Sequence, residues 1–225
     1  MRLTPRSATP PGVSFGSSLP DRVLRLDIVQ QPYGPCPAAL EAIDAMPGLP
    51  ARALAPLLVQ LLAATYRAPA ARIFLTAGVE GTVDGLIAGC PGPIVAFPPS
   101  ASAAALATKH SHRPILHVWR GPGRAQTIDV DIAADLPADG LVLIESPSDP
   151  LGAMLSATDA VRLARACRLL VIDERFAEFS GMSLLPLAFE FDNIVIVRSF
   201  ETWAAIQEPP CAWVLSSPQA AELVG

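Results

Sequence analysis

Two apolar runs of the sequence, Leu169–Ile172 and Ile194–Val197, contain no interrupting polar residue. Continuous runs of this length are typical of strands buried on both faces of a parallel sheet. Polar residues follow each run at once: Asp173-Glu174 after the first and Arg198-Ser199 after the second. Because ligands of open α/β sheets bind at the carboxyl ends of the strands, we expect any site of this protein at that edge.

The rest of the chain alternates predicted strands with predicted helices. A turn-rich segment leads into a helix near Pro37, and an apolar helical stretch covers 51–67. Ranges predicted as strands are Arg72–Thr76, Pro93–Pro98, Pro114–Trp119, Gly140–Glu145, Arg168–Asp173, Asn193–Ser199 and Cys211–Ser216. Segments rich in Ala and Leu between them, 79–89, 100–110 and 156–167, are predicted helices. The pattern predicts a three-layer α/β fold with a doubly wound, mostly parallel sheet of seven strands.

Composition favours a protein outside the membrane. The chain has 225 residues, 51% hydrophobic, and a mean hydropathy of +0.41. Its longest apolar run, Ala53–Ala64, contains Pro56 and Gln60 and is too short to cross a bilayer. The amino terminus has no apolar core of a signal peptide, so we expect a cytoplasmic protein with no membrane partner.

Charge and cysteine content narrow the chemistry further. The formal net charge is −5 and the basic residues are scattered, so we expect no nucleic-acid partner. The four cysteines, Cys36, Cys90, Cys167 and Cys211, form no C-x-x-C motif and lie in or beside apolar runs. They are predicted to be buried free thiols. Three histidines, His110, His112 and His117, lack accompanying ligands at a metal-site spacing and are predicted to lie at a surface turn.

The segment around the two central strands resembles a known family. Asp173–Phe176 and Arg198–Thr202 resemble the segments of pyridoxal-phosphate (PLP) aminotransferases of the histidinol-phosphate type that read Asp-Glu-Ala-Tyr and Arg-Thr-Phe-Ser-Lys. Pro32–Pro35 and Pro37 resemble the amino-terminal segment of the same family. The resemblance covers roughly residues 24–225 and implies the large domain of fold-type I PLP enzymes. It implies the absence of the small C-terminal domain. The amino-terminal segment is rich in Pro, Ser and Gly without periodicity, so a flexible arm is predicted over 1–23.

The resemblance also assigns the residues that would bind PLP. It places Asp173 at the carboxylate that holds the pyridine nitrogen, and Gly78 at the start of the phosphate cradle. Thr202 stands where the family has its Schiff-base lysine, and Glu201 replaces a serine of the cradle. Further departures from the family pattern fall at Ser102, Asp149, Phe176 and Glu208–Pro210.

The residues that would contact PLP are replaced, whereas the strands and helices of the family are retained. This combination favours a catalytically inactive, aminotransferase-like protein. We expect it to bind no PLP and to act as a homodimer or as a heterodimer with an active paralogue. The alternative is a PLP-dependent aminotransferase of the histidinol-phosphate type that uses Lys109, the only lysine. The order of the elements predicts that Lys109 lies far from the Asp173 edge, near a helix C-terminus where its charge is favourable.

A third interpretation is a cation site. Five acids are expected near one edge of the sheet: Glu145, Asp149, Asp173, Glu174 and Glu201. Carboxylates clustered at strand ends are the ligands that hard cations prefer, although such acids are more commonly solvated.

Overall fold

The computed structural model describes residues 31, 33–45, 51–102, 105, 109, 112–119, 133, 135–206 and 210–223. The arm predicted over 1–23 lies outside these residues, as does His110. No helix in the described part of the chain is long and apolar enough to cross a membrane.

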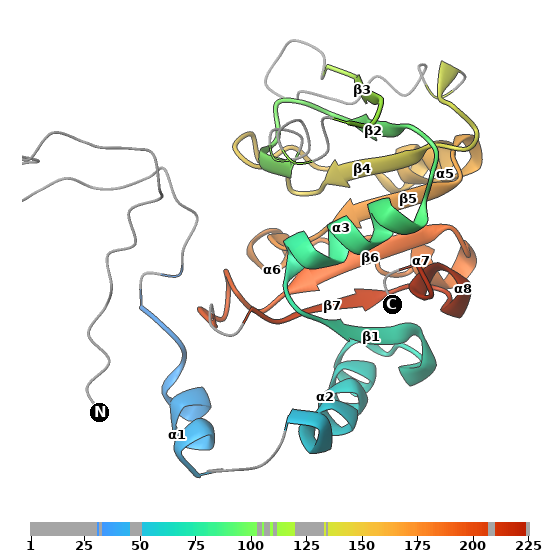
Figure 1. Ribbon diagram of the computed structural model, residues 1–225. Coiled ribbons are helices and arrows are strands. Elements are labelled where there is room, and N and C mark those ends of the chain that lie inside the picture. Colours follow the sequence, from blue (N-terminus) through green and yellow to red (C-terminus); the bar gives the residue numbers. More distant parts are fainter. Residues whose placement is uncertain are drawn as a thin grey trace, which may run out of the picture.

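Seven strands form one sheet in the order β1-β7-β6-β5-β4-β2-β3 (Figure 1). Their bounds are β1 Ile73–Thr76, β2 Ile94–Ala96, β3 Ile115–His117, β4 Leu141–Glu145, β5 Leu169–Asp173, β6 Ile194–Ser199 and β7 Ala212–Leu215. Strands β3, β2, β4, β5 and β6 are parallel, and β7 runs antiparallel to both β6 and β1. All seven predicted strands are confirmed. Strands β1, β4, β5 and β6 begin one residue later than predicted and end at the predicted residue, β7 is two residues shorter than its predicted range, and β2 and β3 are each three residues shorter.

Helices cover both faces of the sheet, with α3 on one face and α5 on the other (Figure 1). Their bounds are α1 Pro37–Ala45, α2 Ala51–Tyr66, α3 Val79–Gly89, α5 Ala157–Ala166, α6 Ala177–Ser180, α7 Leu187–Glu190 and α8 Pro218–Ala221. A 3-10 turn, η1, covers Ala70–Arg72. The Ser156 hydroxyl caps α5 by accepting from the Asp159 N–H at 3.1 Å. The predicted helix over 100–110 is described at only some positions.

Two apolar cores lie on opposite faces of the sheet because successive side chains of a strand point to opposite sides. On the α3 face pack the strand residues Leu141, Leu143, Leu169, Val171, Val195 and Val197. On the other face, against α2 and α5, pack Val142, Ile144, Leu170, Ile172, Ile194 and Ile196. Both clusters are almost fully buried, which explains the uninterrupted apolar runs of the sequence.

The same alternation divides the polar strand ends into two groups. Asp173 follows Val171 onto the α3 face, whereas Glu174 continues on the opposite face. On β6, Arg198 likewise faces away from the α3 side. The edge expected to hold one site therefore holds two polar groups, and only the group on the α3 face contains Asp173.

All four cysteines are free thiols, as expected. Cys90 and Cys167 are buried within apolar surroundings. The prediction of burial is wrong for Cys36, which is exposed one residue before α1 begins.

Candidate functional site

Asp173 ends β5 and is completely buried, yet its carboxylate is already satisfied. Arg175, two residues later, donates from Nε to Asp173 Oδ2 at 2.8 Å and places Nη2 2.7 Å from the same oxygen. The Arg175 backbone N–H donates to Oδ1 at 3.0 Å. The nearby carboxylates raise the pKa of Arg175 despite its burial, so the guanidinium stays charged.

Arg175 reaches across to the first turn of α3. Its Nη1 donates to Glu80 Oε1 at 2.8 Å, which joins the end of β5 to the amino end of α3. One guanidinium therefore bridges two carboxylates on different elements, in the bidentate geometry for which arginine is suited.

Gly78 caps the amino end of α3 with a φ of +87°, a conformation that favours glycine. A Cβ added there would lie 3.0 Å from Pro210 Cβ and 3.2 Å from Glu201 Oε1. The Glu201 carboxylate thus lies against the helix start, at the place that the family resemblance assigns to the second cradle residue. Its Oε1 is buried and accepts no hydrogen bond from the residues that the structure describes.

Burial raises the pKa of the Glu201 carboxyl, and the negative charge of Glu80 raises it further. The charge of Arg175 acts in the opposite direction. Arg175 thus forms ion pairs with Asp173 and Glu80, and its charge also acts on the nearby Glu201 carboxyl.

Glu145 ends β4 beside Asp173, with which it is in register. Its Oε1 accepts from the Ser102 backbone N–H at 2.7 Å and from the Ser102 hydroxyl, and its Oε2 accepts from the Asp149 N–H at 3.0 Å. Burial raises the pKa of Glu145, and the neighbouring Asp173 raises it further. Ser102, one of the departures from the family pattern, therefore holds a carboxylate in this structure.

The prediction that Lys109 lies far from the Asp173 edge is wrong. Lys109 and Arg175 line one pocket, with a cavity volume of about 280 Å³, between α3 and the segment that follows β2. The carboxyl ends of β2, β4 and β5 lie on the same edge because these strands are parallel, and Lys109 follows β2 in the chain. Its Nζ forms an ion pair with Asp84 of α3.

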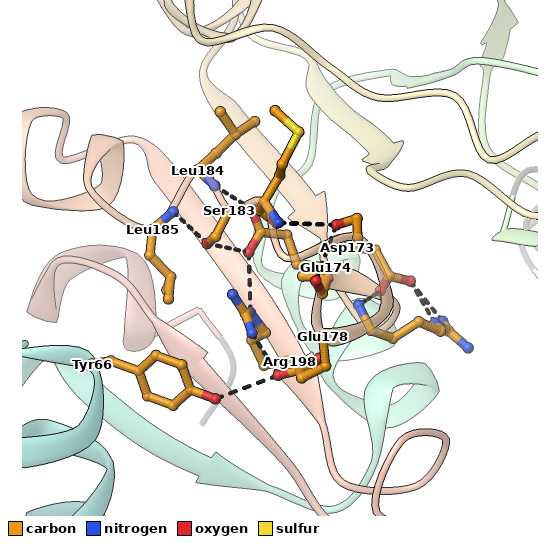
Figure 2. A network of polar contacts seen from close by, with 12 residues as sticks. Tyr66, Asp173, Glu174, Glu178, Ser183, Leu184, Leu185 and Arg198 are labelled. Carbon is orange, nitrogen blue, oxygen red and sulfur yellow. Dashed lines mark hydrogen bonds and ion pairs between the residues drawn. The ribbon is translucent and has the colours of Figure 1, made fainter. Parts of the chain in front are cut away.

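The second polar group lies on the opposite face, and Figure 2 shows its contacts. Its arginine, Arg198, is more completely buried than Arg175. Arg198 donates from Nε to Glu174 Oε2 at 3.0 Å and from Nη1 to Glu178 Oε1 at 2.5 Å. Its guanidinium carbon lies 5.3 Å from the centre of the Tyr66 ring and 5.9 Å from that of Trp213. The Tyr66 hydroxyl donates to Glu178 at 3.4 Å, so the network ties α2 to β6 and α6.

The cation site expected from five acids does not assemble. Asp173 and Glu174 lie on opposite faces and each pairs with an arginine, while Glu145 is held by Ser102. Across the described residues, no three His, Cys, Asp or Glu side chains gather where they could hold a metal ion. His112 and His117 are exposed, as predicted.

Arg175 is the site residue that the sequence analysis missed. A signal for it was present, because Arg175 stands where the family pattern Asp-Glu-Ala-Tyr has alanine. Spacing gave no reason to pair it with Asp173, since residues two apart along a strand end need not touch. The turn after β5 brings the Arg175 side chain back onto Asp173.

Proteins similar to this chain are found both by sequence and among solved structures. No family model matches the chain. A histidinol-phosphate aminotransferase of Roseiflexus castenholzii is 31% identical over 202 residues, covering 83% of this chain and 53% of the relative. Histidinol-phosphate aminotransferase 2 of Burkholderia pseudomallei is 32% identical over 203 residues, covering 82% of this chain and 56% of the relative. The chain thus spans about half the length of these relatives.

Solved structures share the fold at lower identity. The histidinol-phosphate aminotransferase of Clostridium acetobutylicum superposes with a TM-score of 0.73 at 18% identity, covering 87% of this chain and 62% of that one. The enzyme of Sinorhizobium meliloti, solved in complex with pyridoxal-5′-phosphate, gives 0.71 at 20% identity, covering 86% and 56%. The chain is therefore an aminotransferase-like protein, homologous to histidinol-phosphate aminotransferases and with the fold of PLP-dependent enzymes of fold type I.

Proposed function

We propose that this chain is a non-catalytic aminotransferase-like protein, which binds no PLP and acts by associating with a second protein chain. The observation that carries the proposal is the pairing of Asp173 with Arg175. A carboxylate that is buried and bonded to its own guanidinium is not available to a cationic ring nitrogen.

The residues present do not fit PLP at three places. Asp173 is occupied by Arg175, as described. Glu201 brings a carboxylate to the start of α3, where a phosphate dianion would have to lie, and like charges in a partly dry site repel by several kcal/mol, on the order of 3. Thr202 has no amine with which to hold the cofactor covalently. We therefore derive no reaction through this group.

Exposed leucines on α2 support an associating role. Leu57 and Leu61 are one helical turn apart and have exposed fractions of 61% and 65%. Helix α1 has no buried residue, yet exposes Ile43. A nine-residue helix is marginal by itself in water, so a partner surface for α1 is expected to stabilise it. A second copy of this chain or an active paralogue are the two partners that we propose.

The double substitution Leu57→Glu/Leu61→Glu is expected to convert an associated species into a monomer. Two carboxylates in place of two leucines would have to be desolvated at the interface, which raises the dissociation constant by roughly a hundredfold or more. Sedimentation velocity of the wild type and the variant measures this. The variant Leu57→Ala/Leu61→Ala removes the same two leucines without adding charge, and is the matched control. A wild-type chain that sediments as a monomer, alone and with its paralogue, would contradict the associating role.

A second candidate function is supported by the position of Lys109. This lysine lines the same pocket as Arg175 and Ser102, so an amine is available there after all. Under this alternative the protein is a PLP-dependent aminotransferase of the histidinol-phosphate type. Two observations count against this alternative. Lys109 forms an ion pair with Asp84, and Asp173 is already paired with Arg175.

Incubation with PLP followed by borohydride reduction separates the two functions. We expect no absorption band of bound cofactor and no adduct in the mass spectrum of the intact protein, because neither Asp173 nor the α3 start is open to it. The alternative predicts one PLP adduct, which peptide mapping locates at Lys109 and at no other residue. Lys109→Arg keeps the positive charge beside Asp84 without a reactive amine and is the matched control. A saturable adduct that Lys109→Arg abolishes would overturn the proposal.

A further inference from the structure

The family resemblance assigns two charged ends to the cofactor position, Asp173 and the start of α3, and each is matched by a charge from the protein itself. At the cationic end, Arg175 donates to Asp173 from Nε at 2.8 Å and from its backbone N–H at 3.0 Å, and its Nη2 lies 2.7 Å from Oδ2 in the same ion pair. A ring N–H of a pyridinium offers one donor to the same carboxylate. The guanidinium therefore supplies the positive charge and the hydrogen bond that a ring N–H would supply, and the backbone N–H adds a second hydrogen bond.

At the anionic end, Glu201 lies where the amino terminus of α3 presents its partial positive charge. The buried Oε1 of Glu201 has no hydrogen-bond donor within the described part of the chain. A buried carboxylate oxygen without a donor is costly, and such a group is retained only where other interactions compensate. The end of α3 and the guanidinium of Arg175 are the positive groups close to it.

Arg175 also closes the pocket between these ends. Its ion pair with Glu80 of α3 means that a ligand reaching from Asp173 to the start of α3 has to break a 2.8 Å contact. Beside this ion pair the cavity itself remains, bounded by the apolar side chains of Val83, Leu143 and Ala105. The obstacle to a ligand is therefore the charge at both ends, while a cavity is still present beside Arg175 and Glu80.

We infer that the protein occupies its own cofactor pocket, with the Arg175 guanidinium in place of the cationic ring nitrogen and the Glu201 carboxylate in place of the phosphate. The inference rests on the proposed function and goes beyond it, because it assigns the loss of cofactor binding to two named side chains. It implies that removing both restores noncovalent binding of a phosphorylated pyridine without any change to the scaffold.

The probe that tests this is pyridoxine 5′-phosphate, which has the ring and the phosphate but no aldehyde to react with Lys109. Equilibrium dialysis is carried out with the full chain as wild type, as Glu201→Ser, and as Arg175→Ala/Glu201→Ser. The control Arg165→Ala/Glu190→Ser makes the same two changes at exposed positions. We expect no saturable binding by the wild type or the control, and a gain of about tenfold or more in affinity for each opened end.

The outcomes separate the inference from the function it rests on. Saturable binding by the wild type overturns the proposed function. No binding by the wild type and none by a folded double variant overturns the inference alone, because the obstacle then lies elsewhere. Arg175→Ala leaves Asp173 buried and unpaired, so the double variant is checked by circular dichroism. If it does not fold, Glu201→Ser decides: it removes an unsatisfied carboxylate and keeps the fold, and failure of this variant to bind the probe more tightly than the wild type also overturns the inference.

Discussion

Replacing Arg198 by alanine is expected to lower the free energy of unfolding by about 3–5 kcal/mol, as breaking a buried ion pair from one side does. Only 4% of Arg198 is exposed, and its side chain bonds two carboxylates, those of Glu174 and Glu178. Glu174 is equally buried, so the substitution leaves its charge in a low dielectric without a cation. The cation–π contacts with Tyr66 and Trp213 are lost as well.

Urea unfolding followed by circular dichroism measures this loss, and Arg165→Ala, at an exposed position of α5, is the matched control. The double variant Glu174→Gln/Arg198→Met should recover at least half of the loss, because it removes the unpaired charge and keeps the volume. A loss below about 1 kcal/mol for Arg198→Ala, the value of an exposed pair, would show that the network is not holding α2 to the sheet.

Replacing Arg175 by alanine is the second large change, with an expected loss of about 2–3 kcal/mol. The pair with Asp173 is geometrically as good as that of Arg198, and Asp173 is fully buried. The loss is smaller because 21% of the Arg175 side chain is exposed, so water partly replaces it in the variant. The Arg175 backbone N–H continues to donate to Asp173.

A double-mutant cycle with Asp173→Asn tests the cause of this loss. Removing the buried charge together with its partner should make Asp173→Asn/Arg175→Ala more stable than Arg175→Ala alone by about 1–2 kcal/mol. Additive effects of the two substitutions would mean that Arg175 stabilises the protein through Glu80 and packing, and that Asp173 is free for another partner.

Arg175 follows the central strand β5, and Arg198 lies near the end of the central strand β6. Each arginine neutralises a carboxylate that the fold buries at the end of β5. In this chain, Asp173 is neutralised by Arg175 from within the same turn. The fold can therefore keep a buried acid at the end of β5 without a ligand, which is consistent with a scaffold retained for association.

Much of the fold could be predicted from the sequence because its signals are local. The uninterrupted runs Leu169–Ile172 and Ile194–Val197 predicted central parallel strands, and both are fully buried strands of one sheet. The family resemblance, carried by short segments, predicted that Glu201 lies at the start of α3, and the structure places it beside Gly78. The first inference needed only the pattern of apolar residues and the order of the elements, and the second needed the family resemblance.

The partners of the site residues were decided by the tertiary structure. Alternation along β5 sends Asp173 and Glu174 to opposite faces, but which cation meets each one depends on the turn after β5 and on the neighbour β6. Lys109 reached the pocket because parallel strands bring their carboxyl ends to one edge, where Asp84 of α3 holds it. The sequence by itself thus determined which residues stand at the strand ends, and that a threonine, Thr202, stands where the resembling family has a lysine. Only the folded chain determined how their charges pair, because ion pairs join side chains through space, from segments whose separation along the chain does not predict their contact.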